Sequence, residues 1–518
     1  MRECEAFRPK ALKETVRLCL VTVYLLGLSG CMVGPNYSRP AVDTQAKWSA
    51  AEAANSSPVT AAGGPATRPS MVQPGPDVPE QWWTTLDDAT LDTLIDRAVR
   101  SNLDLRSAAA RVREARADLS GAKAALFPTA NVGGGYQFDR SDGPLFPAKT
   151  GDYNFYEAGF DATWELDIFG GERRGIEASG DSLQAQTEDR RDVLVSLLAE
   201  VCRDYVELRT IQRRSAIASD NLRIAQDSLG LTQRLRAVGV TGDLDVTRAQ
   251  SEVTNTAASL PAFDAQAKQS IHALGVLLGQ SPDSLLAELS PSAPIPQPPA
   301  RVPVGLPSDL LRRRPDVRRV ERQLAAATAS IGVAEANLYP QFSLTGDFGV
   351  GATDTPQLFN WSSRYVSVGP SARWLLFDAG RVLADVDSRR AVREELLANY
   401  QETILLAVRD VEDSIIAFER EQERRELYRQ TVNADAEAVR IANDQYANGV
   451  TGYLTVLDSE RSLFAAQDAL AVSDGEISLD LVALYKGLGG GWESVEKNAP
   501  QTPSFPRPPM PAAAIVER

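Results

Sequence analysis

The sequence has few of the residues from which metal centres, disulfide frameworks and most acid–base catalysts are built. Its 518 residues include only 4 cysteines, 4 methionines and 1 histidine. That histidine, His272, lies in the apolar helical run 271–278, where a helix residue is expected more than a catalyst. Motifs typical of serine hydrolases, zinc proteases and nucleotide-binding loops are also missing. We therefore expect a protein that is not an enzyme and holds neither a cofactor nor a metal.

Basic charge and long apolar runs are also scarce. Lys and Arg number 54 against 69 Asp and Glu, which gives a formal net charge of −15. A nucleic acid partner would require a basic surface, so none is expected. No apolar run approaches the roughly 20 residues that a membrane-spanning helix needs. If the chain crosses a membrane, it must do so through β-strands.

Residues 1–30 have the composition of a cleaved signal peptide. Basic side chains precede an apolar stretch, Leu18–Leu28, which is too short for an anchor helix. The stretch ends in Leu28-Ser29-Gly30-Cys31, which resembles the lipobox of bacterial lipoproteins. The resemblance implies cleavage before Cys31 and a lipid, such as palmitate, attached to the new N-terminal residue. Because Met32 rather than an aspartate follows, the resemblance also implies the outer membrane as the location.

The body of the chain contains one pattern twice. Leu126-Phe127-Pro128 returns as Leu338-Tyr339-Pro340, and Trp164 returns as Trp374. A stripe of apolar positions, stepping by four and three residues, recurs with the same phase in both copies. Its members are Leu194, Leu198, Val201, Tyr205 and Leu208, and then Ile404, Val408, Val411, Ile415 and Phe418. We predict two repeats, at residues 86–290 and 305–491.

The segments that flank the repeats are rich in proline and small residues. Residues 31–85 show no apolar periodicity, which predicts a lipid-anchored linker or an arm along the surface. Residues 492–518 are Pro-rich, which predicts a disordered tail.

Each repeat contains an unusually long helix. The second has 68 residues, Arg381–Asn448, without glycine or proline, which as one helix would extend roughly 100 Å. The first has its counterpart at residues 172–238, and the 3.5-residue period of the apolar stripe predicts coiled-coil packing. Gly239 and Gly449 are expected where each helix turns back into a second one. Shorter helices are expected at residues 91–126 and 308–338.

Four windows alternate apolar and polar residues, namely 130–138, 156–165, 342–350 and 366–374. Lengths near ten residues suit a transmembrane β-barrel, although a soluble sheet with one buried face alternates in the same way. Segments 127–169 and 339–377 hold 18 of the 35 aromatic residues, as expected of interfacial girdles, and with the lipobox they favour the barrel. Four strands cannot close a barrel, so two, three or four chains must share one.

Several motifs resemble the outer membrane factor family, in the NodT-type lipoprotein branch of its TolC/OprM-like members. They are Cys31–Tyr37, Gln81–Trp83, Gly305–Asp316, Tyr453–Asp458 and Leu484–Trp492. The resemblance implies a homotrimeric α+β membrane protein, internally duplicated, in which each protomer gives four strands to a transmembrane β-barrel. A long antiparallel coiled-coil α-barrel would continue it into the periplasm.

The same resemblance implies a passive exit duct of a tripartite efflux pump that exports small toxic compounds. Its partners would be a periplasmic adaptor (membrane fusion) protein, an inner-membrane transporter of the resistance-nodulation-division type, and outer membrane lipid. Two other functions stay open at this point. One is the outer-membrane duct of a type I protein secretion system, and the other is a structural coiled-coil lipoprotein of the cell surface.

The resemblance also implies a closed periplasmic aperture. Asp458 matches the acid whose copies ring the opening, and Leu454 matches an apolar constriction one turn earlier. Tyr446 matches a tyrosine that bonds across to an acid of the first repeat, here Asp245. A solvated helix residue is the alternative for Asp458, and a plain coiled-coil contact for Tyr446. The sequence departs from the family pattern at three places: Gln445, Thr451 and Thr455 stand where members carry arginine or a second acid.

Overall fold

The computed structural model describes residues 32–42, 48–49, 70–73, 75, 78–141 and 151–498. The predicted signal peptide and Cys31 lie outside the described residues. The chain divides into two compact units. Unit 1 comprises Met1–Ala46, Asp104–Val193 and Pro307–Arg409, and unit 2 comprises Lys47–Leu103, Leu194–Leu306 and Asp410–Arg518.

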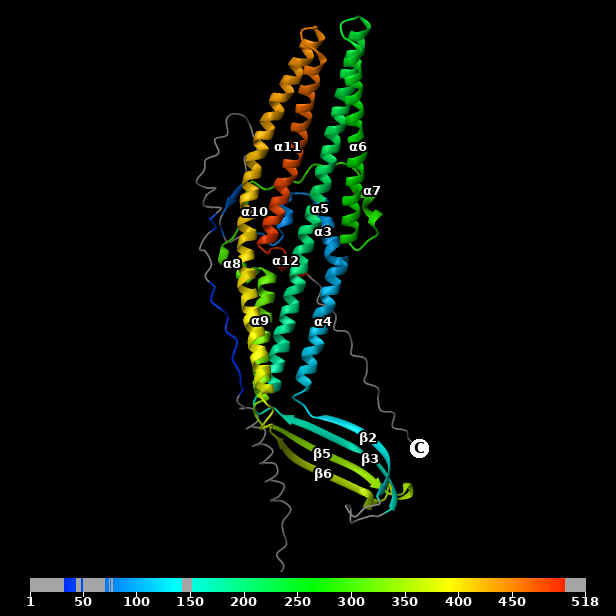
Figure 1. Cartoon of the computed structure of the whole chain (residues 1–518), viewed down its shortest axis with the longest axis vertical. Helices are drawn as coiled ribbons and strands as arrows, with labels where there is room; N and C mark the ends of the chain where they lie inside the picture. Colours follow the sequence, from blue (N-terminus) through cyan, green and yellow to red (C-terminus); the bar gives the residue numbers. More distant parts are fainter. Residues whose placement is uncertain are drawn as a thin grey trace, which may run out of the picture. The chain divides into compact units, whose positions relative to one another are not determined.

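The elements occur in the same order twice. The first copy contains α4 (Leu103–Ala124), β2 (Thr129–Ser141), β3 (Gly151–Leu166), α5 (Gly171–Ala237) and α6 (Asp243–Leu277). The second contains α9 (Pro315–Ala336), β5 (Gln341–Ala352), β6 (Arg364–Arg373), α10 (Arg381–Ala447) and α11 (Tyr453–Gly487). The long helices α5 and α10 each have 67 residues, and α6 and α11 each have 35. Figure 1 shows each long helix folding back along its shorter partner as a hairpin.

Shorter elements connect these parts: β1 (Met71–Gln73), η1 (Trp82–Leu86), α3 (Ala89–Ser101), η2 (Pro282–Leu285), α7 (Leu286–Leu289), β4 (Arg301–Pro303), α8 (Pro307–Arg313), η3 (Thr355–Gln357), η4 (Trp361–Ser363) and α12 (Trp492–Asn498). The prediction of a disordered tail at residues 492–518 is wrong for its first seven residues, because 492–498 form helix α12. Residues 499–518 lie outside the described part of the chain.

Two predicted short helices are each broken in two. The first is interrupted at Asn102, whose side-chain amide donates to the Leu277 carbonyl at 2.9 Å. The second is interrupted at Arg314, because the proline that follows it disfavours helical backbone in the preceding residue. Proline tolerates the first position of a helix, and α9 therefore begins at Pro315.

Glycines end both long helices, as predicted. Gly239 and Gly449 have φ angles of 79° and 69°, in the left-handed region that favours glycine. A Cβ atom placed on Gly449 would lie 4.0 Å from Val240 Cγ1, so the two hairpin turns lie side by side.

The predicted apolar stripe is buried. All five members of its first copy are at most 2% exposed, and Ile404, Val411, Ile415 and Phe418 are equally buried in the second. Only Val408 is half-buried. Helix α10 carries a further apolar stripe that the described part of the chain leaves exposed, formed by Leu405, Ile416 and Leu427, which are 50–70% exposed.

Unit 1 contains an antiparallel sheet in the order β2-β3-β5-β6. Three of the four predicted strand windows fall within these strands, and the fourth, 366–374, ends one residue beyond β6. Register places apolar side chains opposite one another on one face, in the row Val132, Phe160, Phe348 and Val366. The other face carries polar side chains, in the row Asn131, Asp161, Asp347 and Ser367. All four residues of the apolar row are more than half exposed.

Tryptophans mark the end of the sheet where the helices begin. Trp164 Nε1 donates to the Leu126 carbonyl at 2.9 Å, and Trp374 Nε1 donates to the Leu338 carbonyl at 3.0 Å. The two bonds are equivalent in the two repeats. At the same end of the sheet, the side chains of Phe127, Leu376 and Phe377 are 68–85% exposed.

The first described residues, 32–42, form an arm that lies on the helices of unit 1. The Arg174 guanidinium, 1% exposed, donates to the carbonyls of Val33 and Gly34 at 2.9 and 3.0 Å and to Asn36 Oδ1 at 2.8 Å. A buried guanidinium needs such acceptors, which holds the first described residues on the start of α5. No helix in the described part of the chain is apolar over a length that could cross a membrane.

Candidate functional site

The four predicted aperture residues all lie in unit 2, at the free ends of the hairpins. A buried cluster joins these ends and consists of Ala249, Ala442, Tyr446, Tyr453, Val456 and Leu457. The rings of Tyr446 and Tyr453 lie 5.6 Å apart. The cluster packs the start of α11 against both α6 and α10, so this part of α11 has one buried face.

The opposite face of α11 presents two of the predicted residues. Leu454 is 49% exposed and Asp458 is also exposed, one turn further along the helix. Residues four apart in a helix lie on the same side, so Leu454 and Asp458 form a single exposed face. The chain therefore displays an apolar side chain and a carboxylate together at the hairpin end.

The predicted bond from Tyr446 to Asp245 is not formed within the chain. The Tyr446 hydroxyl is buried and has no hydrogen-bond partner in the described structure. Asp245 instead accepts a hydrogen bond from Thr241 Oγ1 at 2.5 Å, and Arg248 lies 3.8 Å from its carboxylate. A role for these two residues in closing an aperture stays a prediction.

The three residues that depart from the family pattern, Gln445, Thr451 and Thr455, lie at an uncharged turn between α10 and α11. Thr451 and Thr455 share a hydrogen bond between their hydroxyls at 2.9 Å. The Gln445 carbonyl accepts from the Val450 backbone amide at 2.8 Å and helps to close the turn. This turn is held without the charged side chains expected from the family.

The sequence analysis missed two neighbouring residues that tie α11 to the first hairpin. Ser228 Oγ of α5 donates to Glu460 Oε1 at 2.5 Å. Arg461 donates through Nε and Nη2 to Glu252 Oε2 of α6 at 2.9 and 2.7 Å. A signal was present, because Glu460 continues the buried spacing of Tyr453, Val456 and Leu463 in α11.

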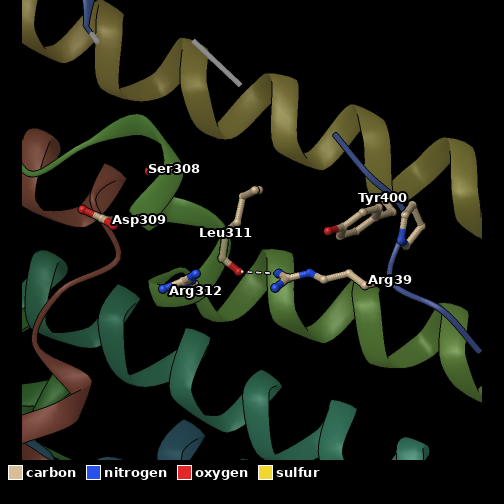
Figure 2. A pocket seen from close by; sticks show the side chains of 7 residues that line it. Arg39, Ser308, Asp309, Leu311, Arg312 and Tyr400 are labelled. Atoms are coloured by element: carbon tan, nitrogen blue, oxygen red, sulfur yellow. Dashed lines mark hydrogen bonds between the residues drawn. The ribbon is translucent and has the colours of Figure 1, made fainter. Parts of the chain in front are cut away.

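A pocket of about 310 Å³ lies in unit 1, where the arm passes α8 and α10 (Figure 2). Arg39 of the arm donates to the Leu311 carbonyl at 3.0 Å. Arg312 of α8 is exposed at the pocket, whereas Arg314 pairs with Asp316 at 2.7 Å. Asp309 also lines the pocket, so its walls carry charges of both signs.

Among the described residues, no group of three or more His, Cys, Asp or Glu side chains is placed to hold a metal ion. His272 lies half-buried in α6. Cys202 is fully buried in α5, and burial raises the pKa of its thiol well above the usual value, which keeps it unreactive. At the hairpin ends, the apolar cluster packs the helices together and the carboxylate of Asp458 is exposed to solvent.

Two long helical hairpins and a sheet with one apolar and one polar face define a protein of the channel class. The family model described as outer membrane efflux protein matches residues 94–280 and 306–490. The chain belongs to this family, and its location is the outer membrane. The resemblance inferred from the sequence motifs is confirmed.

Relatives with known names are similar over nearly the whole chain. Toluene efflux pump outer membrane protein TtgF of Pseudomonas putida is 33% identical over 91% of this chain and 96% of the relative. Nodulation protein T of Rhizobium leguminosarum bv. trifolii is 29% identical over 92% of this chain and 97% of the relative.

The fold agrees with a solved structure. The outer-membrane channel OprN has a TM-score of 0.82 and 35% sequence identity, over 89% of this chain and all (100%) of the OprN chain. Sequence and fold therefore both identify an outer membrane efflux protein whose family and neighbours are channels.

Proposed function

We propose that this protein is the passive outer-membrane exit duct of a tripartite efflux pump and releases small toxic compounds to the outside. The observation that carries the proposal is the sheet, whose apolar row is exposed on one face and whose polar row lies on the other. Such two-sided strands suit a wall between lipid and water. The exposed aromatic and leucine side chains at the helix end of the sheet suit a membrane interface.

The sheet is incomplete within one chain. Strands β2 and β6 are its two edges, and an unpaired edge is not tolerated in lipid. Three copies of the four-stranded sheet would close a twelve-stranded barrel, the state implied by the family resemblance. The uncovered stripe Leu405, Ile416 and Leu427 on α10 supports further helix packing in a homotrimeric α-barrel.

A duct of this kind has no energy source of its own. We propose a periplasmic adaptor and an inner-membrane resistance-nodulation-division transporter as its partners, on the basis of the family resemblance. Drug susceptibility of a deletion strain tests this, because deletion should sensitise cells that carry the cognate pump and have no effect in cells that lack it. Equal susceptibility in both backgrounds would reject these partners.

Charge on the apolar row provides the sharpest test of the barrel. Phe348→Lys should prevent membrane assembly, because lysine facing the bilayer core costs about 2–4 kcal/mol in each copy. Asp347→Lys, the adjacent position on the polar face, should assemble normally. Outer-membrane fractionation and heat-modifiable migration give the readout. Equal assembly of both variants would contradict the assignment of the two faces.

We propose that the N-terminal residue of the mature chain, Cys31, carries lipid and that the lipid is not the main anchor. With an ordinary signal-peptidase site, Cys31→Ser should still yield trimers in the outer membrane, because the barrel itself holds the protein there. Mass spectrometry of the N-terminal peptide should show the lipid only in the wild type. Recovery of the variant as a soluble periplasmic protein would reject the barrel.

A further inference from the structure

The second hairpin contacts the first through two adjacent residues of α11 that point to different helices. Glu460 contacts Ser228 of α5, and Arg461 contacts Glu252 of α6. We propose that these four residues form a clamp that positions the exposed Leu454 and Asp458 face of α11. The proposal rests on the proposed duct, since it assigns the clamp a role in setting the resting aperture.

Burial of its two acids makes this clamp different from a surface ion pair, although the Arg461 side chain itself is 51% exposed. Glu460 is 0% exposed, Glu252 is 6% exposed and Ser228 is 7% exposed. Both Arg461 bonds go to the same oxygen of Glu252. Removing the arginine therefore leaves a buried carboxylate without its counter-charge, which is far more costly than loss of an exposed pair.

The position of the clamp connects it to the aperture face. Glu460 and Arg461 follow Asp458 within one turn of α11, and the charge of Asp458 acts on Arg461. The start of α11 is otherwise held by the apolar cluster. Apolar contacts are not directional, so they specify the rotation of α11 about its axis and its position along that axis less well than hydrogen bonds do. Contacts to two different helices of the first hairpin can define both.

Glu460 also gives the clamp a dependence on pH. Burial raises the pKa of its carboxyl group, Glu252 raises it further, and the Ser228 hydroxyl opposes these effects. The groups that act on it are Ser228 on α5, Glu252 on α6, Asn443 on α10 and Tyr453 on α11. Its second oxygen, Oε2, is buried without a hydrogen bond of good geometry.

The direction of the pH effect follows from the raised pKa. The folded state favours the protonated carboxyl, so the contact is fully stabilising below the pKa of an unfolded glutamate. That stability is lost as the pH rises through the raised folded pKa. We expect the clamp to be tight in acid and weaker at alkaline pH, and Glu460→Gln, which is always neutral, to abolish this dependence.

The experiment measures the clamp in two ways on the full-length assembled protein. Hydrogen–deuterium exchange of residues 453–463 reports how firmly the start of α11 is held, and resting conductance in a planar bilayer reports the aperture. Arg461→Met and Glu252→Gln should each speed exchange and raise resting conductance about fivefold or more, at the lower end of coupling between linked sites. The exchanged pair Glu252→Arg with Arg461→Glu should restore both readouts towards wild type.

The matched control breaks another ion pair between the same hairpins. Arg214 of α5 pairs with Asp468 of α11 at 2.7 Å, two turns beyond Arg461. Arg214→Met should leave exchange of residues 453–463 and resting conductance unchanged. Heat-modifiable migration verifies assembly of every variant. With exchange expressed as protection relative to the intrinsic rate at each pH, a series between about pH 5 and pH 8 should be flat for Glu460→Gln only.

The outcomes separate the clamp from the duct. Unchanged exchange in Arg461→Met, or no restoration by the exchanged pair, overturns the clamp. Faster exchange without higher conductance overturns its role in positioning the aperture. A wild-type protein that does not conduct rejects the proposed duct and with it the positioning role, whereas the exchange data still decide whether the clamp exists.

Discussion

Val411→Asp is expected to abolish the assembled protein. Val411 is 0% exposed on α10, and a Cβ atom on Gly487 of α11 would lie 3.3 Å from Val411 Cγ2. An aspartate there has neither space nor a partner, and an uncompensated buried charge costs about 3–5 kcal/mol in each chain. Heat-modifiable trimer migration should be lost and the protein should be degraded. Val411→Ala should assemble with reduced thermal stability.

The control for this variant must be an exposed acid of the same helix. The sequence favours Glu421, since it follows the stripe in a polar stretch, but the structure shows its side chain only 12% exposed. Burial, together with Glu476 and then Glu421, raises the pKa of Asp480 to about 7. Glu423, whose side chain is 43% exposed, is the better choice, and Glu423→Gln should be silent. Equal loss of assembly in both variants would show that α10 tolerates no change at all.

Asp458→Ala is expected to abolish block of the channel by multivalent cations added from the periplasmic side. In the proposed trimer, three exposed Asp458 side chains surround one axis, and a ring of carboxylates attracts cations. Resting conductance should stay low, because closure depends on helix packing rather than on mutually repelling carboxylates. Single-channel recording with a trivalent cation gives the measurement. Unchanged block would place the ring elsewhere.

Tyr446→Phe serves as the complementary variant. The hydroxyl has no partner within the described chain, so phenylalanine removes no internal bond. We expect higher resting conductance with cation block intact, through loss of the bond to Asp245 that the family resemblance implies for the assembled channel. Wild-type conductance in Tyr446→Phe would show that this tyrosine is only a packing residue of the apolar cluster.

Much of the fold could be predicted from the sequence because its signals are local and periodic. The stripe that includes Tyr205 and Val411 sets which side of each long helix is buried. The glycines at 239 and 449 end the helices, since left-handed backbone is strained for other residues. Alternation around Phe160 and Phe348 defined the strands and their two faces. These properties depend only on neighbours along the chain and therefore appear in both repeats.

Features that depend on distant residues were decided only by the tertiary structure. Arg174 is buried because arm residues about 140 positions away supply its acceptors, and no local pattern indicates this. The Tyr446 hydroxyl has no partner among the described residues, because Asp245 bonds locally to Thr241. The spacing of α11 indicates that Glu460 is buried, but it does not indicate that Ser228 and Glu252, more than 200 positions away, are the partners of Glu460 and Arg461. Helical periodicity specifies which face is buried, whereas the partner of a buried polar group is specified only when distant helices pack together.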